Sequence, residues 1–252
     1  MPVHSLASMT WTAVRELPAS RTVAVLPTGA IEAHGPHLPL GTDVIIAEAM
    51  ARAGADRLAG HGFHVLMLPT LTMTAAPFAS EFAGTLDVSP ETTTMILAGV
   101  LRSLAAQGIR VAAIANGHHD PAHVDALRRA SPTDGIVLVF PDLTRRRWAE
   151  RLTPEFQSGA CHAGRYETSI VLAERPDLVR TDVMSTLTPN PRSLVDAIRS
   201  GLSTFTSAGG ADAYFGFPAD ATAAEGRAIV DVLGAILAEA VVEAIGPAGA
   251  AS

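Results

Sequence analysis

Two short polar segments of the chain contain the residue types that bind divalent metal ions. The first is PTGAIEAHGPHLPLGTD at 27–43, and the second is NGHHD at 116–120. Both combine imidazole nitrogens with carboxylate oxygens, a ligand mixture that suits zinc, manganese or ferrous iron. A bound metal makes water nucleophilic near neutral pH, so the segments indicate a hydrolase. The candidate ligands are Glu32, His34 and Asp43 in the first segment and His118 and Asp120 in the second.

The spacing within each segment supports joint metal binding. Both segments place two candidate ligands at i and i+2, which puts their side chains on one side of an extended backbone. Asp43 has two carboxylate oxygens and could bridge two metals, although capping of a helix beside Thr42 is an alternative. For His118 and His119 the alternative is an ordinary loop pair near a helix start. We favour metal binding because several groups of ligand-type side chains coincide.

Both polar segments follow predicted strands. Apolar runs that end in proline, glycine or asparagine alternate with helical patterns, which indicates an α/β fold with parallel strands and right-handed crossovers. Ligands bind beyond the carboxyl ends of such strands, so both segments should meet at one edge of the sheet. No linker or internal repeat is visible, and we expect a single domain over 1–252. The predicted strands are 22–27, 63–69, 109–116 and 135–141, and the predicted helices are 42–58, 89–107, 121–130, a segment ending at 174, 192–202 and 223–245.

Composition excludes several classes of protein. The formal charge is −7, and the largest basic cluster is Arg145–Arg147, which we interpret as a solvated helix face. We therefore expect no nucleic-acid partner. No uncharged run resembles a membrane helix, and no secretory signal is visible at the N-terminus. A single cysteine, Cys161, fits a reducing compartment, so we expect a soluble cytoplasmic protein.

The remaining histidines and the cysteine have weaker claims to chemistry. We expect His37 to fix its proline-rich loop or to support a ligand, and His123 to lie on a helix surface. His61 and His64 flank a strand without a nearby carboxylate, so we interpret them as surface or core residues. Cys161 precedes a histidine, but adjacent side chains point apart in extended backbone, which argues against a thiol nucleophile.

These same residues carry a resemblance to a known family. The segment 27–43 resembles the signature P-x-G-S-x-E-Q-H-G-x-H-L-P-L-x-T-D of the creatininase (creatinine amidohydrolase) family. NGHHD resembles the second motif of that family, and HAGRYETS at 162–169 resembles the third. The similarity runs from about residue 20 to about residue 180. It implies an α/β fold with three α/β/α layers and a mostly parallel central sheet.

The resemblance also implies a dinuclear site with two divalent ions of zinc, manganese or iron. Asp120 is shorter than the glutamate of creatininase, so Glu167 is the alternative ligand if Asp120 does not reach the metal. His162 matches the catalytic histidine, a proton donor to the leaving nitrogen. Glu167 would otherwise act as a base. Carried across, the metal sets are Glu32, Asp43 and His118 for one ion and His34, Asp43 and Asp120 for the other.

The departures from the family pattern affect the substrate more than the metals. Ala30 and Ala33 replace the usual serine and glutamine. The aromatic residue that stacks on creatinine would fall near Ser158, and the nearest substitutes are Trp148 and Phe156. Other aromatic residues, in loops 70–85 and 203–220, could form an apolar wall or belong to the core. They are Phe78, Phe82, Tyr214, Phe215 and Phe217.

We therefore predict a metal-dependent amidohydrolase that cleaves a C–N amide bond of a small amide, cyclic amides included, through a metal-activated water. One alternative is a peptidase that trims a short C-terminal peptide from a ribosomal precursor, as mycofactocin-pathway members of the family do. The other is a non-catalytic, metal-stabilised binding protein. Family resemblance also implies a homo-oligomer, commonly a hexamer.

Overall fold

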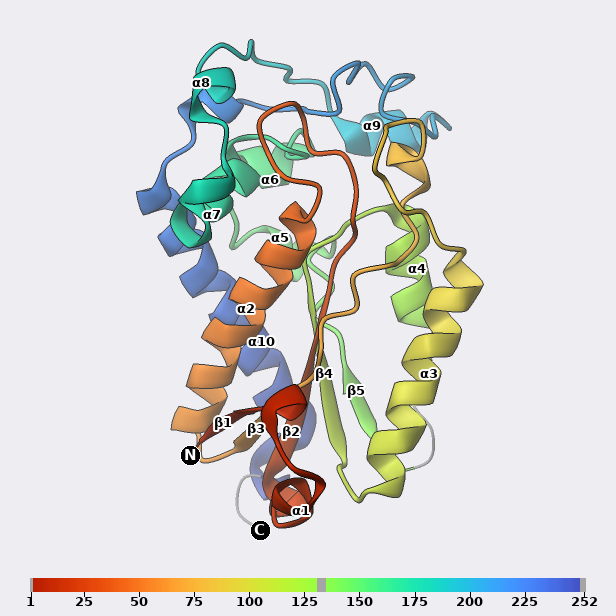
Figure 1. Ribbon diagram of the computed structural model, residues 1–252, viewed down its shortest axis with the longest axis vertical. Helices are drawn as coiled ribbons and strands as arrows, with labels where there is room; N and C mark the ends of the chain where they lie inside the picture. The colour runs from red at the N-terminus through yellow and green to blue at the C-terminus, as the bar shows by residue number, and fades with distance from the viewer. Residues whose placement is uncertain (1, 131–134, 250–252) are drawn as a thin grey trace.

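Five parallel strands form the central sheet of the computed structural model, which describes residues 2–130 and 135–249 (Figure 1). Their order across the sheet is β1-β3-β2-β4-β5, and each neighbouring pair is parallel. β2 and β4 therefore lie side by side although more than 80 residues separate them in the sequence. The intervening segment contains β3 and the crossover helices α2 and α3. The strands are β1 (Val3–Ser5), β2 (Thr22–Thr28), β3 (His64–Met67), β4 (Val111–Asn116) and β5 (Val137–Val139).

Helices cover both faces of this sheet, and ten α-helices occur in the described ranges. α2, α7 and α10 lie on one face, and α3 and α4 lie on the other (Figure 1). This arrangement confirms the three-layer α/β/α fold. The helices are α1 (Trp11–Arg15), α2 (Thr42–Gly60), α3 (Pro90–Ala106), α4 (Pro121–Arg129), α5 (Arg146–Ala149), α6 (Pro154–Ser158), α7 (Arg165–Glu174), α8 (Thr181–Met184), α9 (Leu194–Arg199) and α10 (Ala223–Gly249).

The alternation of side chains along β2 explains why the sheet carries two apolar cores. Val23 and Val25 point into the core shared with α2 and α10, whereas Ala24 and Leu26 point into the core shared with α3 and α4. Successive residues of a strand face opposite sides of the sheet, so an unbroken apolar run suits a strand that is covered on both faces. Burial of this apolar surface is the main force that holds the layers together.

The structure corrects some of the predicted boundaries. α2 begins at Thr42 with Gly41 as its N-cap, so Thr42 is not the cap; its hydroxyl donates to the carbonyl of Pro39 at 2.7 Å. The edge strand β1 was not predicted, and the segment 141–160, in which no helix boundaries were predicted, contains α5 and α6. Within the described residues, none of the helices combines the length and apolar character needed to cross a membrane.

Candidate metal centre

The ends of β2 and β4 bring the two polar segments together. Thr28 pairs with Asn116 in the sheet register, and the Thr28 hydroxyl donates to the Asn116 side-chain oxygen at 3.1 Å. The Asn116 amide nitrogen donates to the backbone carbonyl of His118 at 2.5 Å. Gly117 lies so close to α2 that a Cβ atom there would collide with the carbonyl oxygen of Asp43. The absence of a side chain at this residue therefore lets the second segment reach the first turn of α2.

The first ligand group consists of Glu32, Asp43 and His118, all buried. Their ligand atoms lie within 4.8 Å of one another. His118 Nδ1 is 2.9 Å from Asp43 Oδ2 and 3.4 Å from Glu32 Oε1. Its other ring nitrogen, Nε2, is 2.9 Å from the carbonyl oxygen of Ala75 and so must carry the proton that it donates there. This contact leaves Nδ1 available as a metal ligand, as in many protein metal sites.

The second ligand group consists of His34, Asp43 and Glu167. His34 Nε2 is 3.1 Å from Asp43 Oδ1 and 3.6 Å from Glu167 Oε2. Its Nδ1 is 3.1 Å from the backbone oxygen of Glu32, an arrangement that again leaves one ring nitrogen for a metal. Asp43 thus presents one oxygen to each group, which is the geometry of a carboxylate shared by two ions.

Asp120 lies outside all three groups of candidate ligands that the described residues form. Its Oδ1 accepts from the backbone N–H of Ala122 at 2.8 Å, and its Oδ2 accepts from the N–H of Phe78 at 3.2 Å. The side chain therefore caps α4 and holds the loop at Phe78. The geometry departs from the expectation that Asp120 completes the second metal set, because Glu167 lies in that place.

His162 belongs to a third group, with Glu32 and His34. Its Nε2 donates to the carbonyl of Ala33 at 3.0 Å, while its Nδ1 is 3.7 Å from Glu32 Oε1. The ring contacts that of Phe205, with centroids 4.1 Å apart. Burial lowers the pKa of His162 well below its ordinary value, so the ring is neutral near pH 7. Nδ1 is then the atom at which this residue can accept and return a proton.

The raised pKa values of the two ligand histidines indicate an excess of negative charge in the cluster. Burial alone would lower the pKa of His34, but the carboxylates of Asp43, Glu167 and Glu32 outweigh burial and raise it to about 10. Burial also lowers the pKa of His118, yet Glu32 and Asp43 raise it well above its ordinary value. The buried carboxylates are thus balanced by bound protons.

The raised pKa values of Glu167 and Glu32 also indicate an excess of negative charge in the cluster. Burial raises the pKa of Glu167 to about 8, and it also raises the pKa of Glu32. One oxygen of Glu32, Oε2, is buried without a hydrogen-bond partner among the described residues. The donor set and this unpaired oxygen fit divalent metal ions, which would replace the protons.

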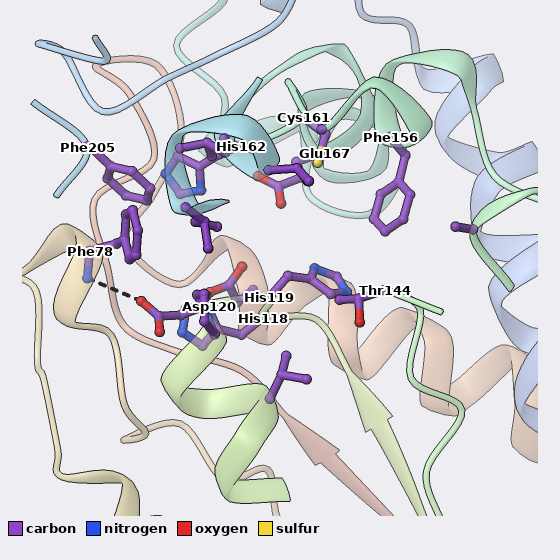
Figure 2. A pocket seen from close by; sticks show the side chains of 18 of the residues that line it. Phe78, His118, His119, Asp120, Thr144, Phe156, Cys161, His162, Glu167 and Phe205 are labelled. Carbon is purple, nitrogen blue, oxygen red and sulfur yellow. Dashed lines mark hydrogen bonds and ion pairs between the residues drawn. The ribbon is translucent and has the colours of Figure 1, made fainter. Parts of the chain in front are cut away.

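A cavity of about 500 Å³ opens onto the cluster. Phe78 and Phe205 lie on one side of it, next to His162, whereas His119 and Phe156 lie on the other (Figure 2). Most of the remaining wall is apolar and comes from α9 and from the segment around α6. The described residues that line this wall include Ala149, Cys161, Leu194, Val195 and Ile198.

The aromatic residues considered in the sequence analysis lie partly at the cavity and partly in the core. Phe78 and Phe156 line the cavity, whereas Trp148 packs in the core shared with α2 and α10. Phe215 is fully buried and supports Phe205 from behind, with ring centroids 6.0 Å apart. Phe205 was not recognised from the sequence; its only signal was an aromatic residue in a predicted loop.

The structure corrects the interpretation of His123 and agrees with those of His37 and Cys161. His123 is buried, not on the helix surface, because its Nε2 contacts the Asn116 side-chain oxygen at 2.8 Å and braces the second segment. His37 contacts the Thr168 hydroxyl at 2.9 Å and ties the first segment to α7, as a loop-fixing residue should. Burial raises the pKa of the Cys161 thiol well above its usual range, which disfavours a nucleophilic role.

Sequence comparisons define the class of protein. The creatininase family model, described as creatinine amidohydrolase, matches residues 7–241. The mycofactocin precursor peptide peptidase of Mycobacterium tuberculosis (strain ATCC 25618 / H37Rv) is 35% identical over 221 residues, which cover 85% of this chain and 82% of that protein. The creatinine amidohydrolase of Pseudomonas putida is 29% identical over 178 residues, with coverage of 65% and 68%. These relatives are an amidohydrolase and a peptidase, so the class is that of hydrolases acting on C–N bonds.

The chain belongs to the creatininase family. Its fold matches that of "Creatininase Mn" with a TM-score of 0.72 at 24% identity, over 98% of this chain and 100% of the other. A mutant creatininase of the Zn-Zn type gives a TM-score of 0.71 at 24% identity, with the same coverage. These structures share the fold of this chain, and their names mention manganese and zinc.

Proposed function

We propose that this chain is a two-metal amidohydrolase that cleaves an amide bond near the end of a short peptide. The observation that carries the proposal is the shared carboxylate of Asp43, whose two oxygens face two imidazoles at the floor of the cavity. The ions would be zinc, manganese or iron. The proposed ligands are Glu32, Asp43 and His118 for one ion and His34, Asp43 and Glu167 for the other.

The bound ions would supply Lewis acidity, which polarises a carbonyl group and lowers the pKa of water. The chain supplies positioning and proton transfer. His162 is held by its hydrogen bond to Ala33 and presents Nδ1 beside Glu32, so we assign it the transfer of a proton to the leaving nitrogen. Phe78 and Phe205 shield this corner of the cavity from water. Glu167 acts in this proposal as a ligand and not as a base.

The size and lining of the cavity favour a peptide over one small ring. A volume of about 500 Å³ lies within the range of pockets that enclose drug-sized ligands, and aromatic and aliphatic side chains cover most of its wall. The peptidase relative also covers more of this chain, 85% against 65% for the creatinine amidohydrolase. This proposal takes up the alternative from the sequence; hydrolysis of a small cyclic amide remains the second candidate, supported by the creatinine amidohydrolase relative.

The setting of the enzyme is part of the proposal. We infer one catalytic domain over 1–252 that works in the cytoplasm as a homo-oligomer with no nucleic-acid partner. The absence of lysine and the net charge of −7 support a role that involves no polyanion. Light scattering at several concentrations would give the oligomeric state directly.

A substrate panel with metal analysis tests the function. Short peptides, lactams and creatinine would be incubated with the protein loaded with zinc, manganese or iron, and amide cleavage would be followed by mass spectrometry. Asp43→Ala and His118→Ala should each lose metal and turnover, whereas the exposed-site control His61→Ala should keep both. Full metal content and full turnover in either ligand variant would show that the site is misassigned.

The two rival functions give different results in the same panel. Cleavage of lactams or creatinine without cleavage of peptides would establish the second candidate. Bound metal and a large metal-dependent rise in melting temperature, with no amide cleaved, would instead indicate a metal-stabilised binding protein.

A further inference from the structure

His119 is a cavity residue that the metal centre does not use. It follows His118 directly, but its ring lies on the other side of the chain and extends toward Phe156 and Thr144 (Figure 2). The ring meets that of Phe156 edge-on, with centroids 5.5 Å apart and an interplanar angle of 79°. This contact fixes the orientation of the imidazole at the cavity wall.

The Nε2 atom of His119 is buried and has no hydrogen-bond partner among the described residues. A buried polar atom without a partner is destabilising, and native proteins rarely retain one. Since the ring also lines a cavity that opens onto the metal centre, a bound substrate can supply the missing partner. The unpaired nitrogen therefore points to a ligand group that forms hydrogen bonds.

A cationic group lies at the same end of the cavity. Arg128 lines the cavity from α4, and its guanidinium bonds the Asp142 carboxylate at 2.5 and 2.9 Å and the Thr144 hydroxyl at 3.0 Å. Arg145 contacts the same carboxylate at 3.2 Å, so two guanidinium groups share one negative charge. The local balance is one positive charge, which favours an anionic ligand group at this rim.

The opposite side of the cavity carries aromatic rings. Phe78 and Phe205 present aromatic surface there, next to His162 (Figure 2). A substrate that spans the metal centre would therefore place an apolar portion against these rings and a polar portion against His119. In a peptide that is cut near its C-terminus, the terminal carboxylate is an anionic group close to the scissile amide.

We propose that His119 and Arg128 form the subsite that recognises the free C-terminal carboxylate of the peptide substrate. The inference rests on the proposed function. His119 donates a ring N–H to a carboxylate oxygen, and Arg128 provides the positive charge at the rim. Charge-assisted hydrogen bonds of this kind are stronger than neutral ones, so the subsite selects the carboxylate over an uncharged terminus.

Matched peptides that end in a carboxylate or in a carboxamide test the proposal. The wild-type protein should cleave the acid with a kcat/KM about ten- to one hundredfold higher than that of the amide. His119→Phe keeps the aromatic contact with Phe156 but removes both ring nitrogens. It should raise KM for the acid about tenfold or more, leave kcat nearly unchanged, and bring the acid-to-amide ratio near one.

Control variants separate recognition from folding. His119→Gln, which restores an N–H donor, should regain part of the preference, and Arg128→Gln should lose it. The control His61→Phe places the same substitution at the exposed end of α2 and should keep the wild-type ratio. An unchanged ratio in His119→Phe, with normal metal content and melting temperature, would overturn the proposal.

Equilibrium binding distinguishes failure of the subsite from failure of the proposed function. Calorimetry would measure the binding of alanyl-phenylalanine and its carboxamide to the metal-loaded protein, under conditions in which mass spectrometry finds both compounds intact. If the wild-type protein binds the acid more tightly than the amide and His119→Phe does not, the result supports the subsite. If the same protein cleaves no peptide, only the proposed function fails. Cleavage of peptides with equal binding of acid and amide would overturn the subsite and leave the function intact.

Discussion

Metal loading should displace protons from the cluster. At pH 7 the metal-free protein holds protons on groups that must lose them before they can bind a cation, because only neutral imidazole and ionised carboxylate act as ligands. We expect the uptake of zinc at this pH to release about two to three protons per chain. The displaced protons come from the two ligand imidazoles and from one ligand carboxyl group.

The magnitude follows from the pKa values. His34, with a pKa of about 10, and His118, whose pKa is also well above its ordinary value, each carry a proton at pH 7. Glu167, with a pKa of about 8, is about 90% protonated. All three pKa values are raised, so the protons are held below these values and lost above them. Apparent metal affinity should therefore increase with pH, by about tenfold per pH unit for each proton displaced.

Calorimetric titration in buffers of different ionisation enthalpy measures this release, since the slope of observed heat against buffer enthalpy equals the number of protons. Glu167→Gln should lower the slope by about two protons at pH 7, because the ion at its group is lost and neither the Glu167 proton nor the His34 proton is displaced. His61→Ala, at the exposed end of α2, should leave it unchanged. A wild-type slope below one proton would refute the reasoning, because the ligands would then be deprotonated before the metal arrives.

Three further predictions concern single residues. Glu167→Gln should reduce the bound metal, measured by elemental analysis, from two ions to about one per chain. Asp120→Ala should keep both ions and lower the unfolding free energy by about 1 kcal/mol, because it removes the cap of α4. Equal metal loss in both variants would restore Asp120 as a ligand. Gly226→Ala should lower the unfolding free energy by about 2 kcal/mol or more in urea titration, because its Cβ would collide with the carbonyl oxygen of Ser169. Gly99→Ala is the matched control: the nearest atom to its Cβ is 3.9 Å away, so a small rise in stability is expected, and a loss there would contradict the steric argument.

The elements that position the site were predictable because their signals are local. Apolar β-branched runs marked β2 and β4, and Ser89 followed by Pro90 marked the start of α3, where Ser89 accepts a hydrogen bond from the N–H of Thr92. The three-residue strand β1 was not predictable in the same way. Val3–Ser5 has no periodic pattern, and it becomes a strand only because β3 provides a partner.

The metal ligands, too, could be predicted only in part from local sequence. Glu32 and His34 lie in the loop after β2, and His118 lies in the loop after β4, where parallel topology brings the two loops together. Asp120 has ligand chemistry and spacing too, but Pro121 after it is also a helix-start signal, and in the structure its oxygens bind backbone N–H groups. His123 was assigned to the surface because one amphipathic turn does not reveal that the Asn116 side chain needs a second bracing contact.

The residues that would hold the ions and those that line the remaining cavity come from separate parts of the chain. The ions' residues follow β2 and β4 or lie in the first turn of α2 and α7, and the close approach at Gly117 brings the loop after β4 against α2. The lining comes mainly from the segment around α6 and from α9 through Phe205. Substitutions in this outer lining can therefore change the substrate while the metal ligands stay the same. Proteins that share this fold and metal centre can in this way evolve different substrate specificities.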